Sequence, residues 1–181
     1  NAATTVPVHC EVKLTIRPSN DSEIKSAIWL PIAGWNGKYQ QVGNGGFAGT
    51  ISYPAMATAL AAGYAAASTD TGHTGPSPNT FANDDVLIDF AHRAIHETTV
   101  AAKATVQRFF GDAAKLSYFN GCSTGGRQAV TAAQRYPDDF DGIVAGAPAS
   151  HTSTQAFGQI WFYQALLLAT PNPIRRPRWA Q

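Results

Sequence analysis

The residues of this chain whose types and spacing could do chemistry centre on Ser123. It lies in the run NGCSTGG (120–126), which contains the pattern Gly-x-Ser-x-Gly between a predicted strand and a predicted helix. In that pattern a sharp strand-to-helix turn lifts the serine hydroxyl above the sheet edge, and the small flanking residues let strand and helix pass closely. The free N–H groups of the first helical turn, including that of Thr124, then favour negative charge. The motif predicts a nucleophilic serine with Thr124 as one oxyanion donor.

A second glycine-rich segment, GNGGFAG (43–49), follows another predicted strand. Because glycine lets the backbone come close to a substrate, we expect Gly45 and Gly46 to supply the other oxyanion donor; the alternative is a turn that needs positive φ. The segment also matches part of a dinucleotide fingerprint, but residues 50–54 delay the next helix, so its N-terminus would not face a pyrophosphate.

A serine nucleophile needs a base, and on this kind of site the chain order is Ser, then Asp, then His. After Ser123 the one histidine is His151, and Asp138, Asp139 and Asp141 precede it. These aspartates come directly after the predicted helix that follows Ser123, which is too early for the usual acid position. A triad made from them is therefore a weak expectation.

Three other histidines have candidate roles. His73, in a Thr-Gly-His loop, could point into the site as a base or could fix the loop, and the sequence does not decide between these. His92 and His96 are one helical turn apart, a spacing that can bind a metal ion, but position 93 is not the Glu of a zinc-protease motif. A capped or solvated pair is the better interpretation.

Composition is typical of a folded domain and excludes several functional classes. The chain has 181 residues, 44% of them hydrophobic and 14% charged, with a net charge of +1. Such a charge does not attract a polyanion, so nucleic acid is a poor partner. No stretch is long and apolar enough for a transmembrane helix, and no signal peptide begins the chain, so the leader of an exported protein would already have been removed.

The elements that must position these residues follow from periodicity and turn signals. Strands are expected at 12–17, 27–30 and 39–42, as an antiparallel start to a sheet. From residue 64 strands alternate with helices, which implies a mainly parallel sheet with helices on both faces. Further strands are expected at 64–69, 116–119 and 142–145, and helices at 55–62, 86–110, 124–136 and 155–168, the last amphipathic or buried.

On the helix at 86–110, one apolar face contains Ala91, Ile95, Ala102, Val106 and Phe109 or Phe110. Residues 70–85 are expected to form a long loop. The domain is placed at 1–170, with 171–181 as an exposed Pro- and Arg-rich tail.

These motifs together resemble the tannase and feruloyl esterase family of α/β-hydrolases. The matching stretches include IWLP (28–31), WNGKY (35–39), GNGG (43–46), GYAAASTDTGH (63–73) and YFNGCSTGGRQ (118–128), and the resemblance runs from about Cys10 to Ile174.

The resemblance implies an α/β-hydrolase fold and a secreted or periplasmic serine esterase that hydrolyses feruloyl, galloyl or related phenolic esters without a cofactor. It assigns Ser123 as nucleophile and Thr124 with the Gly45–Gly46 loop as oxyanion hole. It also implies a disulfide between Cys122 and a cysteine next to the catalytic histidine.

This chain departs from the family's pattern in its extent. In the family the catalytic Asp and His, the lid domain and its calcium site lie C-terminal to the nucleophile, in sequence that is absent here. The chain is therefore expected to be a truncated, nucleophile-bearing half, with Asp and His supplied by a C-terminal segment or chain. The alternatives are a catalytically incomplete remnant or binding module, and a smaller esterase that uses His151 or His73 as base.

Overall fold

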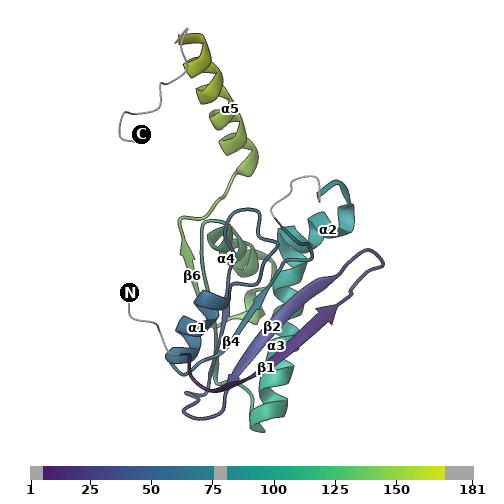
Figure 1. Cartoon of the computed structure of the whole chain (residues 1–181), viewed down its shortest axis with the longest axis vertical. Helices are drawn as coiled ribbons and strands as arrows, with labels where there is room; N and C mark the ends of the chain where they lie inside the picture. The colour runs from purple at the N-terminus through teal and green to yellow at the C-terminus, as the bar shows by residue number, and fades with distance from the viewer. Residues whose placement is uncertain (1–5, 76–80, 170–181) are drawn as a thin grey trace, which may run out of the picture. The chain divides into compact units, whose positions relative to one another are not determined.

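A single six-stranded sheet organises the residues that the computed structural model describes, 6–75 and 81–169 (Figure 1). Its strands lie in the order β1-β2-β4-β3-β5-β6. They are β1 (His9–Ile16), β2 (Ile24–Pro31), β3 (Lys38–Val42), β4 (Ala65–Thr69), β5 (Leu116–Cys122) and β6 (Gly142–Gly146). All six expected strands are present, and β5 runs three residues further than predicted, up to the residue before Ser123.

The sheet is antiparallel at one edge and parallel across the rest. β1 pairs antiparallel with β2, and β2 pairs antiparallel with β4. β3 lies between β4 and β5 and is parallel to both, so the expectation that β3 belongs to an antiparallel start is wrong. The reason is a crossover: the helix between β3 and β4 carries the chain back to the end of the sheet where β3 began, so both strands run in the same direction.

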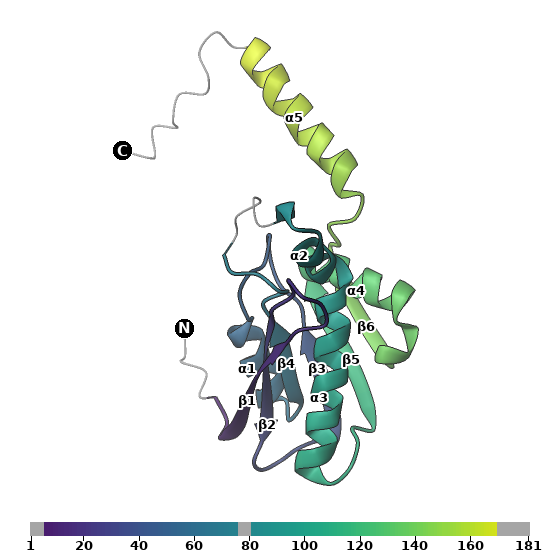
Figure 2. The same cartoon turned by 90° about the vertical axis from the view of Figure 1, so that its right-hand side faces the viewer.

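Helices cover both faces of the sheet, as predicted. α1 (Tyr53–Ala61) begins with Pro54 in its first turn and packs on β2, β3 and β4. On the opposite face lie α3 (Ala94–Phe110) and α4 (Thr124–Arg135), which Figure 2 shows alongside the strands.

Each face has its own hydrophobic core. The larger core joins β-strand residues such as Ile28, Tyr39 and Phe119 to Val106 of α3 and Ala129 of α4. The smaller core packs Met56 and Leu60 of α1 against the other side of the sheet. Because strand residues alternate between the two faces, both cores fix the register of the strands that carry the candidate site.

The helical region expected at 86–110 is present in three pieces. α2 (Asp84–Ile88) leads into a π-helical segment at Asp89–Arg93 and then into α3, which ends at Gly111 in the left-handed conformation. Phe110, not Phe109, completes the apolar face: its ring stacks on Trp35 at 3.8 Å, and Phe109 is exposed.

The chain divides into two compact units between Pro148 and Ala149. The second unit contains His151 and α5 (Thr152–Ala169), in which Phe157, Trp161 and Phe162 are among several exposed large apolar side chains. Among the described helices none combines the length and hydropathy needed to cross a bilayer. The tail predicted at 171–181 lies outside the described residues.

Candidate active site

Ser123 stands at a sharp turn between β5 and α4. It is exposed, and its backbone has φ 60° and ψ −118°, a conformation that L-residues rarely adopt. Its N–H donates to the carbonyl oxygen of Gly146 at the end of β6, over 3.0 Å. The strand–turn–helix context predicted from the Gly-x-Ser-x-Gly pattern is therefore present, and the strained residue is the serine itself.

The turn at Ser123 requires glycines because the backbone of α4 packs directly against the backbone of β5, of β6 and of the glycine-rich loop. A Cβ on Gly121 would lie 2.4 Å from the carbonyl oxygen of Gly125, and one on Gly43 would lie 2.6 Å from the Cα of Gly125. A Cβ on Gly126 would lie 2.2 Å from the carbonyl oxygen of Gly146. These contacts are shorter than van der Waals distances, so a side chain at Gly121 or Gly126 would push α4 away from β5 or β6, and one at Gly43 would push it away from the glycine-rich loop.

The glycine-rich loop at 43–49 reaches the first turn of α4. The Thr124 hydroxyl donates to the carbonyl oxygen of Gly46, and the N–H of Gly125 donates to the carbonyl oxygen of Asn44 over 2.7 Å. The N–H of Thr124 has no acceptor within its own helix, because it is in the first turn. The loop and the Ser123 turn, which the sequence predicts to be neighbours, are therefore in direct contact.

Two buried amide side chains, which the motif analysis missed, hold this contact. Gln128 accepts from the N–H of Asn44 and donates to the Asn44 side-chain oxygen, both over 3.0 Å. The Asn44 amide donates to the carbonyl oxygens of Thr50 and Thr69. The available signal was spacing: residues 124 and 128 are four apart, so they lie on one face of the helix.

His73 holds the glycine-rich loop from the other side. Its ring is buried, with Nε2 at 2.7 Å from the carbonyl oxygen of Phe47 and Nδ1 at 3.3 Å from the Thr71 hydroxyl. The rings of Phe81 and Phe90 meet it edge-on. With both ring nitrogens occupied, His73 in this arrangement fixes the loop; neither nitrogen is left to accept a proton from Ser123.

Asp70 orders the strand end that leads to His73. Its carboxylate accepts from the N–H groups of Lys25 and Gly72 over 3.0 and 2.8 Å. Burial raises the pKa of the Asp70 carboxyl, although these two hydrogen bonds oppose the rise. The carboxylate thus accepts hydrogen bonds from the surrounding backbone, which indicates a structural role.

The aspartates that follow α4 lie at the wrong end of the sheet for a triad. Asp141 accepts from the N–H of Ser117 over 2.7 Å, at the amino end of β5. Ser123 follows the carboxyl end of the same strand, about 20 Å away at ~3.3 Å per residue. Asp139 is bonded to His96 instead. His151 belongs to the second unit.

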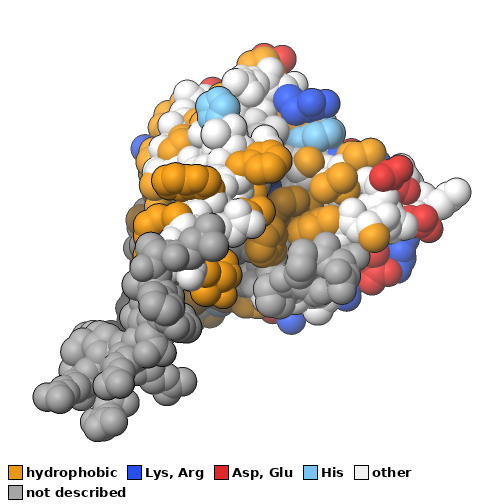
Figure 3. All heavy atoms as spheres, turned by 90° about the horizontal axis from the view of Figure 1, so that it is seen from above, with side chains coloured by type: hydrophobic (Ala, Val, Ile, Leu, Met, Phe, Trp, Pro, Cys, Tyr) orange, Lys and Arg blue, Asp and Glu red, His pale blue; other side chains and the backbone are white. Residues whose placement is uncertain are grey.

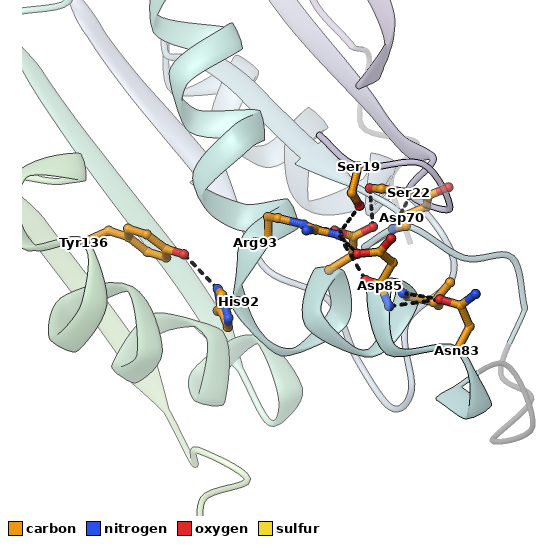
Figure 4. Close-up of polar contacts among 11 residues, drawn as sticks. Ser19, Ser22, Asp70, Asn83, Asp85, His92, Arg93 and Tyr136 are labelled. Atoms are coloured by element: carbon orange, nitrogen blue, oxygen red, sulfur yellow. Dashed lines mark hydrogen bonds and ion pairs between the residues drawn. The ribbon is translucent and has the colours of Figure 1, made fainter. Parts of the chain in front are cut away.

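His92 and His96 both contact Tyr136, the residue that follows α4. The Nδ1 of His92 is 2.7 Å from the Tyr136 hydroxyl (Figure 4), and the ring of His96 stacks on the Tyr136 ring at 4.1 Å. Burial, with the positive charges of Arg135 and Arg93, lowers the pKa of His92. Within residues 6–75 and 81–169 no three ligand side chains converge as a metal site would require.

A buried ion pair anchors the start of α3. Asp89 is fully buried and accepts from the guanidinium of Arg93 and the hydroxyl of Ser22, both over 2.5 Å. Arg93 also donates to Ser19 and Asp85, as Figure 4 shows. The network ties the turn between β1 and β2 to the helical region that supports His73.

Neither cysteine is in a disulfide, and Cys122, directly before Ser123, is exposed. A hollow of about 340 Å³ opens between α1 and β5 with Asn44, Asn120 and Cys122 in its lining. Ser123 and Thr124 are not among its lining residues.

The family model described as "Tannase and feruloyl esterase" matches residues 10–177. The chain belongs to this tannase and feruloyl esterase family. It is 45% identical over 150 residues to a probable feruloyl esterase B-2 of Aspergillus flavus, an alignment that covers 82% of this chain and 28% of the relative.

Solved structures agree with this family membership. The chain superposes on a feruloyl esterase B from Aspergillus oryzae with a TM-score of 0.76 at 42% identity, covering 78% of this chain and 28% of that one. It superposes on another Aspergillus oryzae esterase with a TM-score of 0.84 at 38% identity, covering 87% and 31%. The chain thus spans less than a third of the length of these relatives. The expected α/β-hydrolase fold is confirmed.

Proposed function

We propose that this chain carries the nucleophile and the oxyanion donors of a serine carboxylic ester hydrolase that acts on phenolic esters, feruloyl or galloyl. The observation that supports this most directly is the strained, exposed Ser123 with the loop at 43–49 bonded to the helix turn beside it. The names of the relatives, feruloyl esterases among them, support the class of ester.

In the proposed reaction the Ser123 oxygen attacks the ester carbonyl carbon while its proton passes to a histidine base. The carbonyl oxygen becomes an oxyanion, which the N–H groups of Thr124 and of Gly45 or Gly46 would stabilise. Collapse of the tetrahedral intermediate releases the alcohol, which takes the proton from the base, and leaves an acyl-serine. Water then attacks the acyl-serine and releases the carboxylic acid. No step needs a cofactor.

The base and its carboxylate partner are proposed to come from a C-terminal segment or chain outside residues 1–148. Within 6–75 and 81–148, the one histidine beside the glycine loop is His73, and both its ring nitrogens are occupied. This same observation favours the second candidate, a binding module that keeps the pocket but cannot turn over an ester.

An aromatic substrate is consistent with the surface near the loop. Phe47, the residue after Gly46, is 51% exposed, and its ring lies 6.1 Å from that of Phe81. Hydrophobic side chains are exposed on the face that Figure 3 shows. An exposed phenyl ring beside the oxyanion donors could pack against a phenolic ring.

A fluorophosphonate probe tests the proposal, because it labels only an activated serine. Labelling of Ser123 in the native protein, lost in Ser123→Ala, together with hydrolysis of methyl ferulate, would establish the esterase. Absence of both in the native protein would support the binding module. The intact mass of the native protein, with and without reductant, tests whether Cys122 holds a second segment in an oxidising, secreted setting.

A further inference from the structure

Every polar group of Asn44 has a hydrogen-bond partner. Its N–H and side-chain oxygen bond to Gln128, its carbonyl oxygen accepts from Gly125, and its amide nitrogen donates to two backbone carbonyls. The residue is 5% exposed. Since it directly precedes Gly45, its position fixes where the backbone of the glycine loop begins.

The two amide groups can adopt one orientation only. The carbonyl oxygens of Thr50 and Thr69 can only accept, so the Asn44 side chain must turn its nitrogen toward them and its oxygen toward Gln128. Gln128 must then present its nitrogen to that oxygen, which leaves its own oxygen for the Asn44 N–H. Reversing either amide would set like groups against each other, without solvent to satisfy them.

The N-terminal part of α4 therefore forms hydrogen bonds with the loop from three of its residues. Thr124 holds the carbonyl oxygen of Gly46, Gly125 holds the carbonyl oxygen of Asn44, and Gln128 holds the Asn44 N–H and side chain. Ser123 begins the same helix. Ser123 and the three residues that hold the loop therefore belong to one stretch of the same helix, at 123–128.

We propose that Gln128 is a positioning residue of the esterase site: through Asn44 it sets where the Gly45 and Gly46 N–H groups stand relative to Ser123 and Thr124. The inference rests on the proposed function. Oxyanion donors act by being held in place before charge develops, and a misplacement of about 1 Å can cost on the order of 100-fold in rate. Gln128 itself, 1% exposed, touches no substrate.

The test is Gln128→Met in the full chain, which keeps the side-chain length and removes both hydrogen bonds. The matched control is Gln41→Met. Gln41 is an equally buried glutamine with three hydrogen bonds, and its partners Tyr39, Thr99 and Ile95 lie outside the loop at 43–49. Both variants are expected to lose comparable stability, which a urea unfolding curve measures.

The measurement that discriminates is the rate of methyl ferulate hydrolysis, divided by the concentration of active sites that a fluorophosphonate labels. For Gln128→Met we expect kcat per titrated site to fall by about 100-fold with KM little changed, because the oxyanion exists only beyond the ground state. For Gln41→Met we expect kcat per site to stay at the wild-type value. An unchanged kcat in Gln128→Met, or an equal fall in both variants, would overturn the inference alone. A wild-type protein with neither turnover nor labelling would instead overturn the proposed function, and the inference with it.

Discussion

Gly126 in the first turn of α4 rests directly on the carbonyl oxygen of Gly146 at the end of β6, where a Cβ would approach to 2.2 Å. The same oxygen accepts the N–H of Ser123. The backbone of Ser123 and the helix that follows it therefore both contact this one carbonyl group, so the turn requires helix and strand to approach closely.

Gly126→Ala should therefore be strongly destabilising. Because the obstructing atom belongs to the backbone, the added methyl group forces a shift of α4, and we expect a loss of about 3 kcal/mol in the free energy of unfolding. Denaturant unfolding measures this. Gly45→Ala is the control, since no atom lies within 4 Å of a Cβ at Gly45; equal stability of the two variants would contradict the packing argument.

His73→Ala should weaken the site without removing its base. Loss of the bond to the Phe47 carbonyl oxygen frees the glycine loop, so we expect ester turnover to fall by about 10-fold to 100-fold. Loss of a catalytic base would cost about 10⁴-fold or more. Kinetics of the variant decide between these, and hydrogen exchange at 43–49 should be faster than in the wild type. A loss of the larger size with an unchanged loop would assign His73 as the base after all.

Arg93→Met should be far more damaging than Arg17→Met, although both remove an arginine from an ion pair. Asp89 is fully buried, so without Arg93 it keeps a charge with one remaining hydroxyl partner, and we expect a loss of about 3 kcal/mol. The Arg17–Glu23 pair is exposed, with 61% and 49% of the side-chain areas accessible, and solvent screens it. Thermal unfolding compares the two variants. Similar melting temperatures would show that the Asp89 network contributes no more to stability than the exposed Arg17–Glu23 pair.

The burial of His92, with Arg135 and Arg93 nearby, should make stability depend on pH. Because the pKa of His92 is lowered in the folded chain, the unfolded chain binds the proton more readily. The contribution of neutral His92 to the free energy of unfolding is therefore complete above the unfolded pKa of about 6.5. It is lost as pH falls from there through the lower pKa of the folded chain. We expect the wild type to lose more stability than His92→Gln between pH 7.5 and pH 5.5, measured by urea unfolding at each pH. Parallel pH curves would contradict this assignment.

Several features of the fold could be predicted from the sequence because they are local. Alternation and 3.6-residue periodicity located the six strands and the helices α1, α3, α4 and α5, and Gly111 marked the end of α3. The Gly-x-Ser-x-Gly spacing located the turn at Ser123, since its glycines are required by the turn itself. The pairing of β3 was not predictable in this way, because periodicity gives a strand's faces but not its neighbours.

The sequence by itself thus determined the elements, the strained serine and the family, all of which depend on residues close together in the chain. The tertiary structure alone decided what the polar side chains do: it gave His73 to the Phe47 carbonyl, Asp141 to the far end of β5, and Gln128 to Asn44, 84 residues away in sequence. A hydrogen bond needs its partner within about 3 Å, and which distant groups come that close is set by how the sheet and helices pack.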